Sequence, residues 1–411
     1  MYPCLSRLVS GVVALALALT LGACGGGEES EHTQSPLGEI VVSTPQPSPE
    51  PTPQPPTVSK LVVCGDAMSH SSNVDDSWDE EKQEYNYLRE MGNVRPWIES
   101  ADYAVANLET TLAADRYSGY PAFRTPDAMA YNLKDLGFDM LLTATNHCMD
   151  AGFSGVCRTL DVLDQVGIAH VGTSRTQAEA DSDIVLADVG GISVAFLGYT
   201  YGTNGFPLSK DAPFSVNLFN KDYLTHLSEL DEARLRADLA KAKALEPDLV
   251  AVMIHWGVEY QTKPNKYQQR VADFLIENGA DLILGGHPHV LQPVEEARTV
   301  TLPDGSQRTG FVAYSLGNFL SGQLTKNDAH VDATAILTIT LERDNETGQS
   351  RVADWEYAPI YRTEDKSAPV RFVLLDPYTV PENALAQAEL AFIHEILGAE
   401  HDSAVRAGNA S

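Results

Sequence analysis

Two observations predict an α/β fold for this chain of 411 residues. Short apolar runs alternate with segments of helical periodicity along most of its length, which is the pattern of strands joined by helices. Several apolar runs also end directly in Asp, Glu, Asn or His, and an open α/β sheet gathers its functional groups at the carboxyl ends of its strands. We therefore expect one mixed α/β domain with a site along a sheet edge.

The expected elements follow one another from residue 59 to about residue 376. The apolar runs predict strands at Leu61–Cys64, Tyr103–Ala106, Met140–Leu142, Ile184–Leu186, Ile192–Leu197, Leu249–Ile254, Leu282–Leu284, Thr299–Leu302, Phe311–Tyr314 and Ala333–Leu341. The helical patterns predict helices at Trp78–Met91, Pro126–Leu136, Gly155–Val166, Glu229–Leu245 and Gln268–Glu277. The domain is expected to span residues 59–376, and a helical tail is expected over residues 377–411.

The first residues are typical of a secretory signal. Arg7 precedes an apolar run at residues 11–19, and Leu-Gly-Ala-Cys follows at residues 21–24. The run is too short for a membrane span. Because Leu-Gly-Ala-Cys resembles the bacterial lipobox, we expect residues 1–23 to be removed and Cys24 to carry a lipid that anchors the chain at the outer face of the cytoplasmic membrane. The alternative is an ordinary cleaved signal with a chance cysteine.

A linker is expected over residues 24–58. Its composition is Pro, Ser, Thr, Gln and Glu, with seven prolines between Pro45 and Pro56. Such closely spaced prolines favour an extended polyproline-type chain that cannot bury a core. The segment is therefore predicted to be a disordered, semi-rigid spacer between the lipid anchor and the folded domain.

Charge and cysteine usage exclude several classes of protein. The formal net charge is −29, which argues against nucleic acid as a partner and against electrostatic docking on anionic lipids. Once the signal and Cys24 are set aside, Cys64, Cys148 and Cys157 remain without paired spacing. A disulfide framework is therefore not expected.

Five predicted strands end in residues that bind divalent metal ions. Carboxylate, amide oxygen and imidazole together suit Mn, Fe, Zn or a similar ion. A carboxylate shared by two ions would allow a bridging water to lose its proton near neutral pH and become a nucleophile. Each residue alone has an ordinary explanation as a turn, a helix cap or a core histidine, but their repetition at strand ends indicates a site. They are Asp66, Glu109, Asn146 with His147, His255, and His287 with His289.

Longer blocks of sequence carry a resemblance to a family. The chain is similar to the CapA/PgsA family of poly-γ-glutamate capsule synthesis proteins over residues 60–320. The matching blocks are GDAM at 65–68, NLET at 107–110, GFDMLLTATNHCMDAG at 137–152, HWGVEY at 255–260, GADLILGGHPHVLQPVE at 279–295 and YSLGNF at 314–319. The resemblance implies the fold of the calcineurin-like metallophosphoesterases, a four-layer αββα sandwich of two mixed sheets flanked by helices.

The resemblance also implies roles for individual residues. Asp66, Glu109, Asn146, His255, His287 and His289 would be the ligands of one or two divalent ions. His147 would protonate the leaving group or hold the substrate, and Asp150 would orient His147. Trp256, Glu259 and Tyr260 are expected to line the cleft and contact the substrate, although Glu259 could instead orient a ligand or cap the following segment.

The chain departs from the wider superfamily at its first motif. The superfamily has Asp-x-His where this chain has Asp66-Ala67-Met68, and a thioether is a poor ligand for a hard ion. His70 could compensate, or it could be a surface histidine. Cys148 could bind a soft metal or be a small filler residue. Because one ligand is lost, a single-metal or catalytically silent site stays open.

Three functions are compatible with these features. The first is an extracytoplasmic, metal-dependent hydrolase that acts on a phosphoester or an amide during synthesis, release or export of an anionic capsule polymer such as poly-γ-glutamate. The second is a non-catalytic lipoprotein that grips the polymer or another cell-envelope substrate within a complex of membrane synthase or export subunits. The third is a solute-binding lipoprotein, which the histidine-rich strand ends do not suit. The sequence thus favours a hydrolase and leaves its catalytic activity open.

Overall fold

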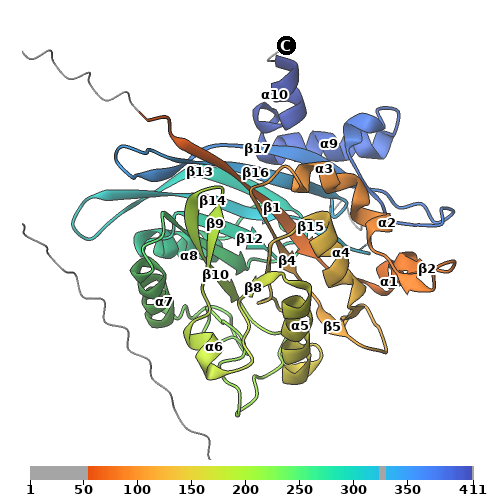
Figure 1. The fold of residues 1–411 in the computed structure, drawn as a ribbon, viewed down its shortest axis with the longest axis horizontal. Helices are drawn as coiled ribbons and strands as arrows, with labels where there is room; N and C mark the ends of the chain where they lie inside the picture. Colours follow the sequence, from red (N-terminus) through yellow and green to blue (C-terminus); the bar gives the residue numbers. More distant parts are fainter. Residues whose placement is uncertain (1–53, 324–329, 410–411) are drawn as a thin grey trace, which may run out of the picture. The chain divides into compact units, whose positions relative to one another are not determined.

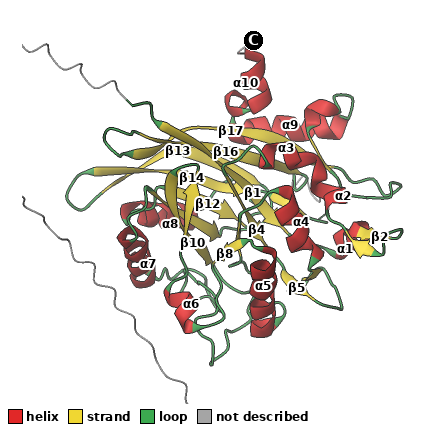
Figure 2. Ribbon diagram, in the orientation of Figure 1, coloured by secondary structure: helices red, strands yellow, loops and turns green. Residues whose placement is uncertain are grey.

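The computed structural model describes residues 54–323 and 330–409. In this part of the chain two β-sheets pack against each other and helices lie on their outer sides (Figures 1 and 2), which confirms the predicted α/β sandwich of two mixed sheets between helices. The expected signal segment and Cys24 lie outside the described residues, as does most of the expected linker.

The larger sheet has its strands in the order β18-β17-β16-β1-β4-β7-β8, and β15 pairs with β1. Strands β1, β4, β7, β8 and β15 run parallel, whereas β16 and β17 are antiparallel to their neighbours. The bounds are β1 (Thr57–Ala67), β4 (Tyr103–Leu108), β7 (Met140–Leu142), β8 (Ala169–Val171), β15 (Asn318–Leu320), β16 (Ala333–Arg343), β17 (Ser350–Arg362) and β18 (Leu374–Leu375).

The smaller sheet has the order β13-β14-β12-β11-β10-β9. Its central strands β10, β11, β12 and β14 are parallel, and the two edge strands are antiparallel to their neighbours. The bounds are β9 (Val185–Val189), β10 (Ile192–Thr200), β11 (Leu249–His255), β12 (Leu282–Gly286), β13 (Leu291–Thr301) and β14 (Gln307–Leu316).

The uninterrupted apolar sequence of strand β11 is explained by its burial on both faces. Successive side chains of a strand point to opposite faces. Ala251 and Met253 are in the core cluster that both sheets share, whereas Val250, Val252 and Ile254 are in a second cluster with helices α7 (Glu232–Ala244) and α8 (Lys266–Glu277). Because both faces of the strand are buried, polar side chains are confined to its end, where His255 stands.

Helices cover both sheets, and α6 (Gln177–Asp181), α7, α8 and α9 (Ala384–Leu397) begin at a side-chain cap. Asn265 accepts a hydrogen bond from the backbone N of Gln268 at 2.9 Å, and the Gln268 side chain accepts one in return from the Asn265 backbone N, a capping box that starts α8. Figure 1 shows α7 and α8 on the outer side of the smaller sheet. The helices are α1 (Ser71–Ser77), α2 (Leu88–Met91), α3 (Arg95–Ile98), α4 (Ala128–Leu136), α5 (Gly152–Val166), α6 (Gln177–Asp181), α7 (Glu232–Ala244), α8 (Lys266–Glu277), α9 (Ala384–Leu397) and α10 (Ser403–Asn409).

The helix predicted at Trp78–Met91 is wrong. This stretch forms a small hairpin of β2 (Trp78–Asp79) and β3 (Glu84–Tyr85), followed by the short helix α2. The Asp79 carboxylate accepts hydrogen bonds from the backbone N of Glu81 and of Lys82, which closes the turn, and the rings of Trp78 and Tyr85 pack 4.9 Å apart. Local side-chain bonds of this kind compete with helix formation.

The segment after residue 376 packs on the domain. Helix α9 contacts β13, β16 and β17, and Asp402 forms an isolated bridge with Tyr357 on β17.

Over residues 54–323 and 330–409, no helix combines the length and the apolar character needed to cross a lipid bilayer.

Candidate metal centre

The six expected ligands converge from both sheets. Asp66 is on β1, Glu109 directly follows β4, and Asn146 lies beyond β7 in the larger sheet; His255 ends β11, and His287 and His289 follow β12 in the smaller sheet. All six side chains are buried. Because these strands are parallel within each sheet, their carboxyl ends meet at one edge. The structure therefore brings together residues separated by more than two hundred positions in the chain.

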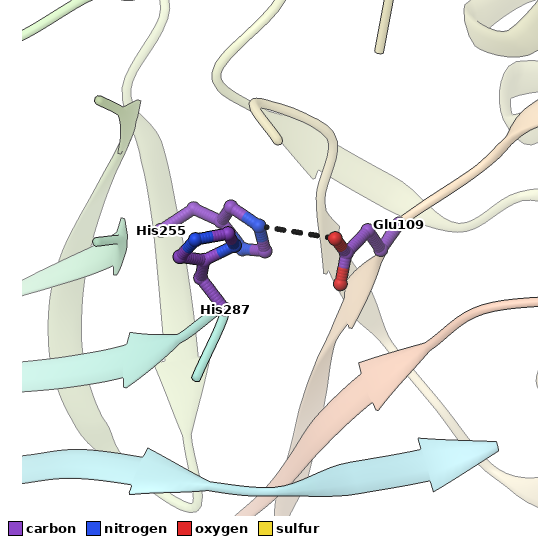
Figure 3. Close-up of side chains that lie close together, drawn as sticks. All are labelled: Glu109, His255 and His287. Carbon is purple, nitrogen blue, oxygen red and sulfur yellow. Dashed lines mark ion pairs between the residues drawn. The ribbon is translucent and has the colours of Figure 1, made fainter. Parts of the chain in front are cut away.

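One group of ligand atoms consists of Glu109, His255 and His287. One ligand atom of each lies within 4.8 Å of the other two. Figure 3 shows the Glu109 carboxylate facing the two imidazole rings, with its Oε1 oxygen 3.3 Å from Nε2 of His255. Asn146 joins this group, because its Oδ1 oxygen lies 2.8 Å from the same Nε2.

A second group consists of Asp66, Glu109 and His289, again with ligand atoms within 4.8 Å of one another. Nδ1 of His289 lies 3.5 Å from an Asp66 oxygen and 3.8 Å from Oε2 of Glu109. Glu109 thus belongs to both groups, with one oxygen toward each. This arrangement suits a carboxylate that bridges two cations.

Several potential ligand atoms of these groups are buried and form no hydrogen bond within the protein. Both carboxylate oxygens of Glu109 and the Nδ1 atoms of His255, His287 and His289 are buried without a hydrogen-bond partner. Buried polar atoms are normally hydrogen-bonded, and unpaired ones are costly. Coordination of a divalent cation would satisfy oxygen and imidazole donors together. The set does not identify the metal.

Charge at the site also favours a cation. Burial alone lowers the pKa of His289, but the carboxylates of Glu109 and Asp66 raise it to about 9. Burial and the charges of His255 and His289 hold the pKa of His287 well below its usual range, so its imidazole stays neutral with a lone pair available to a metal. Burial disfavours the charged form of Asp66, yet the neighbouring imidazoles of His289 and His255 and the hydrogen bond from Asn107 lower its pKa.

Gly286 allows the two sheets to approach at this point. A Cβ atom there would lie 2.0 Å from Nδ2 of Asn107 and 2.5 Å from Oδ1 of Asp66. Asn107 donates to that Asp66 oxygen at 2.9 Å, and the backbone N of His287 donates to the other at 3.0 Å. These bonds fix the carboxylate in one orientation. Asn107 is a functional residue that sequence reasoning missed, although it lies within the NLET block.

The loop that carries the two histidines has an unusual backbone. His287 has φ of 97° and His289 has φ of 59°, in the region that L side chains seldom occupy. Such conformations persist where the surroundings hold them, and they concentrate at functional sites. Here the backbone bends on both sides of Pro288, so that both imidazoles turn toward the carboxylates.

His147 and Asp150 form a pair beside the ligands. Nδ1 of His147 lies 2.8 Å from Oδ2 of Asp150, and the backbone N of Phe123 donates to the same oxygen at 2.7 Å. Because the carboxylate accepts, Nδ1 carries the proton and Nε2 is left for a substrate. The edge of the His147 ring packs against Phe123, with centroids 4.6 Å apart.

Asn204 was not predicted, yet it connects this pair to the ligands. Its Nδ2 lies 3.3 Å from Nε2 of His147, and its Oδ1 accepts from Nδ2 of Asn146 at 3.1 Å. Tyr201 was missed as well; its ring lies 4.7 Å from that of His287. Both residues follow β10, whose end at Thr200 lies beyond the predicted end at Leu197. The sequence YGTNG after an apolar strand was the available signal.

The three residues expected to line the cleft lie in different surroundings. Trp256 is wrong as a cleft residue: it is buried among the side chains under α8, stacks on Tyr314, and donates from Nε1 to the Tyr314 carbonyl at 2.9 Å. Glu259 and Tyr260 are exposed. Glu259 lines a pocket of about 710 Å³ together with Tyr201, Lys266 and His287.

The residues at the altered first motif do not replace the missing imidazole. Met68 is buried. His70 accepts a hydrogen bond at Nδ1 from the backbone N of Gly322 at 3.1 Å, which uses that lone pair and leaves the proton on Nε2. His70 belongs to none of the candidate ligand groups found among the described residues. Burial raises the pKa of the Cys148 thiol to about 12, which fits a small filler residue and not a thiolate ligand.

Comparison with known proteins gives the family. A family model described as "Bacterial capsule synthesis protein PGA_cap" matches residues 60–323 of this chain. "Capsule biosynthesis protein CapA" of Bacillus anthracis is 31% identical over 263 residues, which are 60% of this chain and 59% of that protein. "PGA biosynthesis protein CapA" of Bacillus subtilis (strain 168) is 30% identical over 283 residues, which are 68% of this chain and 66% of that protein.

The match thus spans about three fifths to two thirds of the length of these curated relatives. Among solved structures, a phosphatase of Mycoplasma pneumoniae is similar with a TM-score of 0.41 and 13% identity, covering 80% of this chain and 98% of that one. The family model covers every residue from Asp66 to His289 that the two ligand groups contain. The chain therefore belongs to the bacterial capsule synthesis family PGA_cap.

Proposed function

We propose that this protein is a metal-dependent hydrolase that acts on a phosphoester or an amide during synthesis, release or export of an anionic capsule polymer. The observation that carries the proposal is Glu109, whose two buried oxygens face His255 on one side and His289 on the other. The family and the names of the relatives support the link to capsule polymer, poly-γ-glutamate being the case that the resemblance implies.

The chain's own residues would divide the work as follows. Asp66, Glu109, Asn146, His255, His287 and His289 would hold one or two divalent ions, which when bound acidify water and polarise the bond to be cut. With a proton on each ring nitrogen, His147 would donate a hydrogen bond or a proton from Nε2 to the leaving group, and Asp150 would keep its ring in place. The pocket beside His287 offers Lys266 to an anionic part of the substrate and Tyr201 as an aromatic wall.

We also propose that the protein acts outside the cytoplasm, tethered by a lipid on Cys24 through the proline-rich linker. The support is the sequence at residues 1–58 alone. Membrane synthase or export subunits and the polymer itself are the partners that this placement favours. Electrophoresis of the full chain from cells grown with a labelled fatty acid tests the anchor: a label lost in Cys24→Ala supports it, and an unlabelled wild-type chain contradicts it.

Hydrolysis by the full chain tests the catalytic proposal. With added Mn²⁺, the wild type should cut a generic aryl phosphodiester, an aryl phosphomonoester or a γ-glutamyl amide, and Asp66→Asn and His287→Ala should lose both bound metal and turnover. Full turnover in both variants would contradict the proposal. Metal binding without any cleavage, with His147→Ala still able to restore capsule to deficient cells, would instead support the non-catalytic polymer-binding role.

A further inference from the structure

A carboxylate outside the six ligands lies within reach of the same centre. One ligand atom each of Glu259, His287 and His289 lie within 4.8 Å of one another. Unlike the other ligands, Glu259 is exposed, and it stands in the wall of the pocket that His287 also lines. Glu259 is therefore an acidic side chain on the solvent-exposed side of the buried candidate metal centre.

The backbone fixes the turn that carries Glu259 to the loop that carries both histidines. Tyr260, with φ of 63°, donates from its backbone N to the Pro288 carbonyl at 2.8 Å. Gln292 donates to the Gln261 carbonyl at 2.7 Å and accepts from Gln268 at 2.8 Å. The position of Glu259 relative to His287 and His289 is thus set by hydrogen bonds to Pro288 and to Gln292. A ligand needs this kind of support.

Each of the two histidines has a buried ring nitrogen that forms no hydrogen bond. His287 and His289 are 4% and 1% exposed, and the Nδ1 atom of each has no hydrogen-bond partner. Glu259 forms no ion pair with Lys, Arg or His in the part of the chain that the structure describes. A carboxylate that neighbours two imidazoles without pairing with a cation is suited to accept a metal ion instead.

The ligand count shows where such a carboxylate would act. Glu109, His255 and His287 have the Asn146 amide as a fourth donor. Among the described residues, the group of Asp66, Glu109 and His289 contains no fourth His, Cys, Asp or Glu, and the residue two positions after Asp66 is Met68. Structural zinc sites have four protein ligands and catalytic ones have three plus an open position, so a group of three side chains leaves room for one more donor.

We propose that Glu259 is a metal ligand, completing from the pocket side the ion site formed by Asp66, Glu109 and His289. This inference rests on the proposed metal centre and extends it by one residue of the HWGVEY block. Because Glu259 is the exposed member of the set, it would be the ligand nearest to an incoming substrate. The site would then retain two ions despite the thioether at Met68.

The test is Mn²⁺ binding to the metal-stripped full chain, measured by equilibrium dialysis with elemental analysis and by the electron paramagnetic resonance of the bound ions. Wild type should bind two ions with the spin coupling of a close pair. Glu259→Gln should bind one of them about tenfold or more weakly and lose the coupling. Glu277→Gln, which removes an equal charge from an exposed residue at the end of α8, should bind as wild type does.

The outcomes separate the two proposals. If Glu259→Gln binds two coupled ions with wild-type affinity, Glu259 is not a ligand, whatever happens to turnover, and the six-residue centre stands. If wild type binds no Mn²⁺, the metal centre and this inference both fail. An unchanged unfolding temperature of the metal-stripped Glu259→Gln chain would show that a loss of binding does not come from misfolding.

Discussion

The Oδ1 oxygen of Asn146 lies 2.8 Å from Nε2 of His255, although the two residues are 109 positions apart in the chain. Asn146 lies in the turn after β7 of the larger sheet, and His255 ends β11 of the smaller one. Both side chains are held in place, because Asn146 Nδ2 donates to Asn204 and His255 ends a strand that is buried on both faces. The contact shows that the two sheets join at their carboxyl edges through functional side chains.

Glu109 is predicted to hold both ions, whereas His255 holds one. Glu109→Gln should therefore abolish tight binding of two Mn²⁺ ions, and His255→Ala should leave one. Elemental analysis after dialysis gives the stoichiometry directly. Equal losses in the two variants would contradict the assignment of Glu109 as the shared ligand.

The His147 and Asp150 pair is predicted to act on the substrate and not on the metal. His147→Ala should lower kcat by about 10²-fold to 10⁴-fold while both ions stay bound. Asp150→Asn should also lower kcat and change its dependence on pH, because the imidazole loses the carboxylate that orients it and stabilises its charged form. Rates over a range of pH, with metal content measured on the same samples, check both statements. Loss of metal in His147→Ala would assign that residue to the ligand set instead.

Gly286 is predicted to be required for the site more than for the fold. In Gly286→Ala the new methyl group would meet Asn107 and Asp66 at 2.0 and 2.5 Å, so the carboxylate must move. We expect a loss of about 1–3 kcal/mol in the free energy of unfolding and a clear fall in Mn²⁺ affinity. Gly92→Ala is the control, because a Cβ there meets only Leu88 at 3.7 Å. Urea unfolding and metal titration of both variants measure the difference.

The carboxyl of Asp183 is predicted to make stability depend on pH. Burial raises its pKa to about 7, against the hydrogen bonds that it accepts from Gly172 N and Asn217 Nδ2. The native state then binds more protons than the unfolded state between about pH 4 and pH 7, so this group's contribution to stability falls as the pH rises through that window. The slope is at most about 1.4 kcal/mol per pH unit.

Asp183→Asn removes that titration and keeps an oxygen acceptor. The variant should gain stability relative to wild type as the pH rises from about 4 to 7, with a constant difference above that. Urea unfolding of the metal-stripped proteins at intervals of half a pH unit measures the two curves. Curves that stay parallel throughout would contradict the prediction.

The candidate ligand set could be predicted from sequence because each member lies at or within a few residues of the end of an apolar strand. Parallel strands end at one edge, so the order of the motifs along the chain was enough to expect that Asp66 and His287 meet. The residue at which a strand ends was harder to predict from the sequence. The end of β10 was placed at Leu197 instead of Thr200, so Tyr201 and Asn204 were not considered for the site.

Other differences arise from contacts that a linear pattern does not show. Trp256 follows His255 by one residue, and alternation along an extended chain turns its ring to the opposite face, under α8. The hairpin at β2 and β3 depends on the Asp79 side chain, which closes a turn inside a stretch of helical composition. The place of Glu259 depends on the bond between Tyr260 and Pro288, which joins two loops.

X-ray diffraction from crystals of the protein grown with Mn²⁺, recorded where manganese scatters anomalously, tests the central claim most directly. We expect two anomalous peaks about 3.5–4 Å apart, one on each side of the Glu109 carboxylate. Crystals that show manganese elsewhere on the protein and no peak within coordinating distance of Glu109 would contradict it.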